Sequence, residues 1–402
     1  MLQASENELF TRVGPGTPAG QWLRRFWHPI AISDRWDGIK TLWNCEEQFF
    51  FRGRMGTAGQ FGQELGTFAG TPTAVRILGE DLVLFRDGSG RLGLLGLNCP
   101  HRRASLAYGR VRDEGLECFY HGWLFDVEGR CLVQPAEPAG SGFKEKVRHT
   151  AYQVREMGGF IWAYMGPGEP PILPKLDVVA RDDGIRACEN FALWPANYFQ
   201  ILENSPDTTH TGILHARREG ERSDIWGRDI PETAWEEDEF GIRCLQRRPN
   251  YDRYTHILLP TTNRLPQPWP GGQFKWPRGS AIFRTPVDDT HTLVLSAVFV
   301  PFVDGRAPDI PPGTRIDITD QLHNHRLQDY QAIASQGEVY DRTREMLGAA
   351  DAGIILLRKL IREGIEAVQR GEDPKGCWRT SYWDRILDFS EDVTDALLVA
   401  AQ

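Results

Sequence analysis

The sequence predicts an α+β fold, in which an all-β first part is followed by a second part that packs helices against an antiparallel sheet. Two observations lead to this prediction. Short apolar runs broken by glycine-containing turns fill residues 74–97, 122–133 and 152–164, and this pattern is typical of hairpins. Further along, residues 240–303 are again rich in strand-forming side chains, and helical patterns flank them on both sides.

The first part opens with a helical signal and closes with a group of prolines. Residues 15–27 predict a short amphipathic helix that leads into an extended stretch and then into the hairpins. Prolines crowd the segment 167–174, which marks a linker because the residue before a proline avoids helical geometry. We therefore predict a first domain over residues 1–166, a linker over 167–176 and a second domain over 177–402.

The second domain is expected to combine one sheet with three helices. Its clearest strand is the apolar run TLVLSAVFVPF at residues 292–302, inside the predicted sheet. Helices are predicted over residues 195–215, 316–336 and 351–370.

Composition indicates an ordinary globular protein. The chain has 402 residues, of which 41% are hydrophobic and 25% charged, and its formal net charge is −9. A negative net charge argues against a nucleic-acid-binding surface. No apolar run approaches the roughly 18 residues of a membrane-spanning helix, and residues 1–15 lack the apolar core of a secretory signal. We expect a soluble protein of the cytoplasm.

Two short motifs indicate a metal cluster in the first domain. Cys99 and His101 form a C-x-H run, and Cys118 and His121 form a C-x2-H run. Each run supplies one thiolate and one imidazole, which fits a Rieske [2Fe–2S] cluster, where two histidines replace two cysteines on one iron. A structural zinc site is the alternative, although its ligands usually come as a cysteine pair followed by a histidine pair. The other cysteines have no paired spacing and are interpreted as small buried side chains: Cys45, Cys131, Cys188, Cys244 and Cys377.

Residues beside the two motifs bear on how the cluster is covered and approached. Trp123 and Phe125 could shield it from solvent, and burial of this kind tunes the potential of such a cluster. Four arginines lie between the two motifs, namely Arg102, Arg103, Arg110 and Arg112. They form either a solvated face or a basic collar that steers an acidic electron donor.

A second group of metal-binding residues lies in the second domain. Asp207, His210 and His215 form the pattern D-x2-H-x4-H. Asp207 and His210 would share one helix face, because three residues turn a helix by about 300°. The two histidines would be about 140° apart, so the helix must break or bulge for both to reach one ion, and Gly212 permits that distortion. Two histidines and one carboxylate make the facial triad of non-haem Fe(II) sites, whereas two neighbouring surface histidines are the alternative.

With both motifs present, the chain resembles the Rieske non-haem iron oxygenases, the ring-hydroxylating oxygenase family. The phthalate-dioxygenase-like branch of this family is similar over essentially the whole chain. The similarity includes stretches outside the metal motifs, at Arg12–Gly20, Gly159–Gly166 and Gln336–Gly348. The resemblance implies an oxygenase built of one kind of subunit, arranged as a homotrimer or as a hexamer of stacked trimers.

The resemblance also implies roles for single residues. Asp207 resembles a bridge that hydrogen-bonds His210 on one side and, on the other, a cluster histidine, here His121, usually of a neighbouring subunit. The third iron ligand would come from a later helix, and Asp351 is chosen because it ends an L-G-x-x-D run before an apolar segment. An Asp there would also suit a helix start, and Asp329 is the second choice. The remaining downstream carboxylates considered for this role are Asp317, Asp320 and Asp341.

One position departs from the family pattern. Some members carry Asn four residues before the bridging Asp, whereas here that place holds Glu203 and the Asn follows as Asn204. The role of that Asn is therefore not transferred to this chain.

The implied function is that of the oxygenase component of a multi-component system. A separate reductase, a ferredoxin-type donor dependent on NAD(P)H, would pass electrons through the cluster to a mononuclear Fe(II), where O2 oxidises a small aromatic substrate. The expected substrate carries a carboxylate and undergoes O-demethylation or another monooxygenation, with cis-dihydroxylation of the phthalate type as the alternative. A Rieske electron-transfer protein, a zinc-stabilised binding module and a sensor of aromatic acids are further alternatives.

The sequence does not select the substrate, because fold and metal set serve many reactions. A carboxylate would be bound by an arginine, and four arginines of the predicted sheet region are candidates that sequence alone does not separate: Arg248, Arg253, Arg264 and Arg284.

Overall fold

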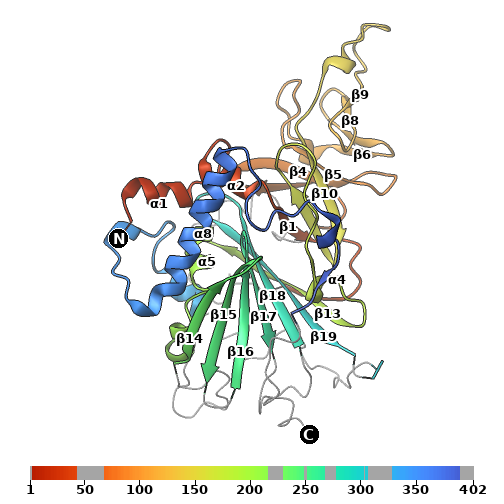
Figure 1. Cartoon of the computed structure of the whole chain (residues 1–402). Coiled ribbons are helices and arrows are strands. Elements are labelled where there is room, and N and C mark those ends of the chain that lie inside the picture. The colour runs from red at the N-terminus through yellow and green to blue at the C-terminus, as the bar shows by residue number, and fades with distance from the viewer. Residues whose placement is uncertain are drawn as a thin grey trace.

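The computed structural model describes residues 2–42, 68–215, 230–248, 251–267, 278–302, 304–306 and 328–389. Figure 1 shows a smaller all-β part, drawn in orange and yellow, above a large sheet drawn in green and teal. Helices lie beside the large sheet. This arrangement confirms the predicted α+β class.

The all-β part contains a six-stranded sheet and a four-stranded sheet among the described residues. The six-stranded sheet has the order β1-β11-β10-β5-β4-β3, with β1 Trp27–Ile32, β3 Thr73–Ile77, β4 Glu80–Arg86, β5 Leu92–Gly96, β10 Ala151–Met157 and β11 Phe160–Tyr164. The four-stranded sheet runs in chain order, with β6 Arg110–Arg112, β7 Gly115–Glu117, β8 Leu124–Phe125 and β9 Cys131–Val133. The hairpins predicted over 74–97, 122–133 and 152–164 are therefore present.

The large sheet has eight strands in the described part of the chain, in the order β14-β15-β16-β17-β18-β19-β13-β2. All neighbours are antiparallel except β13 and β2, which are parallel. The strands are β2 Ile39–Leu42, β13 Gly184–Trp194, β14 Glu232–Glu237, β15 Gly241–Arg248, β16 Tyr251–Leu258, β17 Thr262–Gln267, β18 Arg278–Pro286 and β19 Thr292–Pro301. The predicted strand at 292–302 is thus β19, which is buried over almost its whole length.

The helices differ from the prediction in two places. An unpredicted helix, α1 Ala4–Thr11, precedes α2 Pro18–Leu23, and α2 is shorter than the predicted 15–27. The predicted helix over 195–215 is divided into α5 Tyr198–Glu203 and α6 Thr209–Ile213. The long helix α8 Ala352–Gln369 agrees with the prediction, whereas of the predicted 316–336 helix only residues 328–334 are described as helical.

The shorter elements connect these parts. The short parallel pair β12 Lys175–Leu176 and β20 Ile386–Leu387 joins the start of the second part to the C-terminal segment, and α4 Asp177–Ala180 follows β12. Residues between β11 and β12 form neither helix nor strand, as expected of a linker, although the domain boundaries themselves stay a prediction. No helix in the described ranges is long and apolar enough to cross a membrane.

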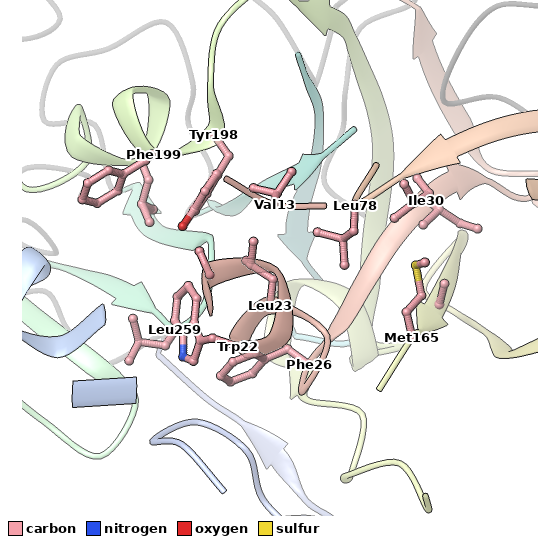
Figure 2. Close-up of a cluster of buried hydrophobic side chains, with 14 of the residues drawn as sticks. Val13, Trp22, Leu23, Phe26, Ile30, Leu78, Met165, Tyr198, Phe199 and Leu259 are labelled. Atoms are coloured by element: carbon pink, nitrogen blue, oxygen red, sulfur yellow. The ribbon is translucent and has the colours of Figure 1, made fainter. Parts of the chain in front are cut away.

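A hydrophobic core joins the two parts of the chain and fixes the position of α5. Figure 2 shows Trp22 and Leu23 of α2 in one cluster with Ile30 of the first sheet and Tyr198 of α5. These four side chains are at most 2% exposed, and full burial of side chains of this size stabilises a fold by about 2 kcal/mol each. The hydroxyl of Tyr198 also donates to the Phe10 carbonyl at 2.9 Å. The N-terminal helices therefore hold α5, which leads directly into the histidine motif.

Candidate metal centres

The two cysteine-histidine motifs lie on loops that share one backbone plan. The carbonyl of Cys99 accepts a hydrogen bond from the Arg103 N–H at 2.9 Å, and the carbonyl of Cys118 accepts one from the Gly122 N–H at 3.0 Å. Each turn closes at a residue with positive φ, 62° at Arg103 and 74° at Gly122. A positive φ reverses the chain within a few residues, so each loop folds its histidine back toward its own cysteine.

The four predicted cluster ligands meet between these loops. The rings of His101 and His121 are 4.6 Å apart, and Cys99 and Cys118 are only 1% and 2% exposed. Burial raises the pKa of the Cys99 thiol to about 12, and the neighbouring Cys118 adds to this effect. Trp123 stacks on His101 at 4.5 Å with an interplanar angle of 4°. The cysteines thus lie in the interior and the histidines toward the surface, as a cluster coordinated by two of each requires.

The surface around the histidines is aromatic more than basic. Tyr108, Phe119 and Tyr120 are 72%, 44% and 52% exposed. Of the four predicted collar arginines, Arg110 and Arg112 share one counter-charge, because both pair with Glu117, at 3.1 and 2.7 Å. Arg102 lies over the Tyr120 ring, and Arg103 is exposed. The four arginines and Glu117 together keep a positive charge, and the predicted steering of an acidic donor stays a prediction.

The second centre brings His210 and His215 together with Asp329. Oδ1 of Asp329 lies 3.2 Å from Nε2 of His215 and 3.7 Å from Nε2 of His210. Donor atoms bound about 2.1 Å from one ion, at angles between 90° and 110°, are separated by roughly 3.0 to 3.5 Å. Within the described residues these three side chains form a group whose ligand atoms all lie within 4.8 Å of one another. The donor set fits a mononuclear Fe(II) site with open positions; the 3.2 Å spacing falls within the expected range, and the 3.7 Å spacing is slightly longer.

The structure corrects the choice of carboxylate. Asp351, the predicted third ligand, is absent from the described histidine-carboxylate group, and Asp329, the second choice, takes its place. The Asp351 carboxylate instead accepts the backbone N–H of Gly348 at 2.7 Å, immediately before α8. Asp351 therefore acts as a cap for the turn that starts the helix, which is the alternative role that its sequence context allows. Asp317 and Asp320 lie outside the described residues.

The outward nitrogens of both histidines face oxygen atoms. Nδ1 of His215 lies 2.9 Å from Oε1 of Gln328, within hydrogen-bond distance, whereas Nδ1 of His210 lies 3.4 Å from Oδ2 of Asp207, an ion-pair contact without a hydrogen bond in the described residues. An acceptor at Nδ1 keeps the proton there and leaves Nε2 free for a metal, and such partners fix the ring of nearly every metal-binding histidine. Gln328 was not predicted from the sequence, and only its position beside Asp329 hinted at it.

Charge within this group favours the ionised carboxylates. Burial raises the pKa of Asp207, but its contacts with His210 outweigh burial and the pKa falls below its ordinary value. Burial also raises the pKa of Asp329, and the two histidines again lower it below the ordinary value. Burial lowers the pKa of His210, whereas Asp207 and Asp329 raise it more strongly. The site therefore carries negative charge on two sides of His210, which suits a divalent cation.

The end of α6 at Ile213, between His210 and His215, lets both histidines reach one point. The sequence suggested a distortion at Gly212, and the helix ends one residue later, whereas the break between α5 and α6 lies before both histidines and places the segment as a whole. The Asp207 carboxylate accepts the Thr209 N–H at 2.9 Å and so starts the new helix. The side chain of Trp235 on β14 donates to the Pro206 carbonyl at 2.9 Å, which anchors the break to the sheet.

Glu203 explains the departure from the family pattern. Its carboxylate is buried and pairs with Arg342 at 2.6 Å and with Arg358 at 2.7 Å, and Arg358 also pairs with Glu345. The following Asn204 points elsewhere, with Nδ2 at 3.4 Å from both Asp329 Oδ1 and His210 Nε2. Glu203 thus belongs to a buried ion network at the end of α5, and Asn204 is the side chain that contacts the histidine-carboxylate group.

Comparison with known sequences gives one domain match and several relatives. Residues 62–152 match the Rieske [2Fe-2S] domain family. The chain is 35% identical to the 5,5'-dehydrodivanillate O-demethylase oxygenase subunit of Sphingobium sp. (strain NBRC 103272 / SYK-6), over 99% of this chain and 88% of that protein. It is 32% identical to the phthalate 4,5-dioxygenase oxygenase subunit of Pseudomonas putida, over 98% of this chain and 93% of that protein.

Solved structures show the same fold at lower sequence identity. NdmA of Pseudomonas putida CBB5 with caffeine superposes with a TM-score of 0.63 at 20% identity, covering 88% of this chain and 94% of that one. The terminal oxygenase of carbazole 1,9a-dioxygenase from Nocardioides aromaticivorans IC177 gives a TM-score of 0.59 at 17% identity, covering 90% and 97%. At these identities the likeness establishes the fold.

Proposed function

The chain belongs to the Rieske non-haem iron oxygenases and is the oxygenase component of such a system, and we propose that it oxidises aromatic compounds that carry a carboxylate. The reaction is O-demethylation or another monooxygenation. The observation that supports a catalytic role is the group of His210, His215 and Asp329, because an electron-transfer protein has no need of a second metal site. A zinc-stabilised binding module would not need this group, and it would not account for the match of residues 62–152 to the Rieske [2Fe-2S] domain family.

The substrate class is supported by the relatives that cover most of the chain. Their names specify dehydrodivanillate, phthalate, phenoxybenzoate and 3-chlorobenzoate, all of which are aromatic carboxylates. A tert-butanol monooxygenase subunit is also 30% identical over 90% of the chain, so the fold alone does not impose an acid. Cis-dihydroxylation is the second candidate reaction, because the phthalate 4,5-dioxygenase subunit is almost as similar as the O-demethylase subunit.

Fe(II) held by the three side chains would supply activation of O2 at its open positions. The protein's own groups have separate tasks in this proposal. Asp207 and Gln328 orient the two imidazoles through Nδ1, and Asp329 supplies the negative charge that holds the cation.

Electrons are proposed to reach the site through Asp207 from His121 of a neighbouring subunit in a trimer or a hexamer of stacked trimers. Two solvent-exposed surfaces support this route. The Asp207 side chain is 33% exposed in the single chain although it contacts His210, and exposed aromatic rings surround the cluster histidines. Both surfaces are therefore available for contact between subunits, and a separate ferredoxin-type reductase would supply the electrons.

The test is a single-turnover reaction that does not depend on finding the natural reductase. Protein with its full iron content is reduced with dithionite under argon, freed of excess reductant and mixed with O2 and a panel of aromatic acids, including methoxylated ones. Loss of CH2 with release of formaldehyde establishes O-demethylation, a gain of one oxygen establishes another monooxygenation, and a gain of two oxygens and two hydrogens establishes dihydroxylation. If no acid in the panel gives product while neutral aromatic compounds do, the proposed substrate class is wrong.

A further inference from the structure

Arg284 on β18 is a buried cation that forms no ion pair with any residue that the structure describes. It is 4% exposed, and its Nε and Nη1 atoms have no hydrogen-bond partner in the part of the chain that the structure describes. Buried polar groups are nearly always satisfied, and a buried charge is normally paired. Of the other arginines proposed from the sequence, Arg264 pairs with Asp177 at 2.6 Å, whereas Arg253 and Arg248 donate to the neutral side chains of Gln246 and Thr211.

Strand register places Arg284 on the face of the large sheet that looks toward the histidine-carboxylate group. Its neighbours in sequence point the other way, since Phe283 packs on Trp162 of the first sheet at 5.3 Å. Arg284 lies opposite Val294 of β19, and opposite residues of an antiparallel pair share a face. Val294 packs with Tyr330, the residue that follows Asp329.

Electrostatics agrees with this placement. Burial lowers the pKa of Arg284 to about 10, while the negative charge of Asp329 acts in the opposite direction. Arg284 therefore stays protonated at neutral pH and lies within electrostatic reach of the metal-binding carboxylate. The two side chains form no ion pair among the contacts of the described residues, so the guanidinium keeps its charge available for another anion.

Two further unsatisfied polar atoms lie beside Arg284 on the same face. Ile282, two residues earlier and therefore on the same face, is flanked by Asn263 on β17 and Ser296 on β19. Oδ1 of Asn263 and Oγ of Ser296 are buried without a hydrogen-bond partner in the described ranges. An apolar surface with a few convergent polar groups is the usual composition of a small-molecule site.

We propose that Arg284 binds the carboxylate of an aromatic acid substrate, with Asn263 and Ser296 beside it as polar contacts. The inference rests on the proposed function, and it assigns the group that recognises the acid. A planar guanidinium forms charge-assisted hydrogen bonds with a carboxylate, and the anion would pair with a guanidinium that forms no ion pair within the described residues. Aromatic side chains adjoin this face, with Trp194 and Tyr330 in edge contact at 5.3 Å, and they match the ring of such an acid.

The experiment measures equilibrium binding to the oxidised holoprotein by calorimetry under argon, which requires no turnover. The probes are 3-methoxybenzoate, phthalate and 3-phenoxybenzoate, each compared with its neutral carboxamide. The wild type is expected to bind at least one acid more tightly than its amide. Arg284→Gln should weaken binding of that acid about 10- to 100-fold, as expected for loss of a hydrogen bond between charged groups, and leave binding of the amide within about threefold.

Matched variants separate this role from a structural one. Arg243→Gln removes an arginine on β15 whose partner is the exposed Glu236, and it should leave both affinities unchanged. Arg284→Met should keep the full iron content and melt no earlier than the wild type, because it replaces an unpaired buried cation by an apolar side chain. A lower melting temperature for Arg284→Met would mean that the fold needs the guanidinium, and the assignment would be wrong.

The remaining outcomes distinguish the inference from the proposed function. If the wild type prefers the acid and Arg284→Gln keeps that preference, another residue binds the carboxylate and the assignment of Arg284 is overturned, while the proposed function stands. If the wild type binds every amide as tightly as its acid, the acid substrate class is wrong and the inference fails with it.

Discussion

Replacing Asp329 and Asp351 in parallel decides which carboxylate holds the mononuclear iron. The two sequence-based candidates have different surroundings, since Asp329 Oδ1 lies 3.2 and 3.7 Å from the two Nε2 atoms, whereas Asp351 caps the Gly348 N–H. Asp329→Ala removes one of three protein donors and the only negative charge among them. Loss of a residue that merely orients a ligand lowers metal affinity about 10- to 100-fold, so loss of the carboxylate itself should cost at least about 100-fold.

The assay is iron and acid-labile sulfide per chain after gel filtration, with the visible spectrum of the cluster as an internal control. Wild-type protein should carry about three irons and two sulfides. Asp329→Ala should carry about two irons with an unchanged cluster spectrum. Asp351→Ala should keep about three irons and lose only about 1 kcal/mol of stability, the usual cost of a missing helix cap. Two irons in Asp351→Ala together with three in Asp329→Ala would refute the structural assignment.

Three further perturbations test other parts of the structure. Asp207→Ala should keep a coloured, reducible cluster and abolish turnover, and product formation at the wild-type rate would exclude the bridge. Glu203→Gln should lower the free energy of unfolding, measured in denaturant, by about 3 to 5 kcal/mol, because two buried arginines lose a carboxylate partner. As a control, Glu236→Gln removes an exposed ion pair and should lower it by less than about 1 kcal/mol. Burial lowers the pKa of His28 to about 4, below the unfolded value of about 6.5, so the unfolded chain binds the proton first as the pH falls. His28 therefore lowers the free energy of unfolding by about 2 kcal/mol between pH 7 and pH 5. The free energies of unfolding of His28→Asn, measured in denaturant at these two pH values, should differ by about 2 kcal/mol less than those of the wild type. An equal difference in variant and wild type would contradict the buried neutral imidazole.

The parts of the site that the sequence predicts are those whose members are close together in the chain. The C-x-H and C-x2-H motifs each lie on one loop, and His210 and His215 lie on one short segment, so their spacing already carries the chemistry. The carboxylate that completes the candidate iron site lies far downstream, and several aspartates there have plausible local patterns. Asp351 has the local pattern of the family, yet only the packing of residues 328–334 against β19 brings Asp329 to the histidines.

Sequence alone also does not identify residues whose role depends on missing hydrogen-bond partners or on contacts with distant elements. Four arginines of the large sheet look alike in sequence, and their difference arises from which face of the sheet they occupy and what lies opposite. Gln328 and Trp235 were not predicted because each acts on the histidine segment from another element. Fold class was predictable because hairpin turns and apolar alternation are local signals, whereas the break at residues 204–208 depends on tertiary anchors.

That break links the stability of the fold to the geometry of the metal site. On a continuous helix the two histidines would diverge by about 140°, so convergence requires that α6 end between them, which it does at Ile213, while the break before Thr209 sets where the whole segment lies. The start is fixed from three directions: Asp207 caps α6, Trp235 holds the Pro206 carbonyl from β14, and the Glu203 network holds the end of α5 against the segment around Arg342. Because Asp207 is also the proposed entry point for electrons, the residue that ends the break is the one that connects the two metal centres. A substitution that loosens any of the three anchors should therefore weaken iron binding and electron transfer together, even where it leaves every metal ligand in place.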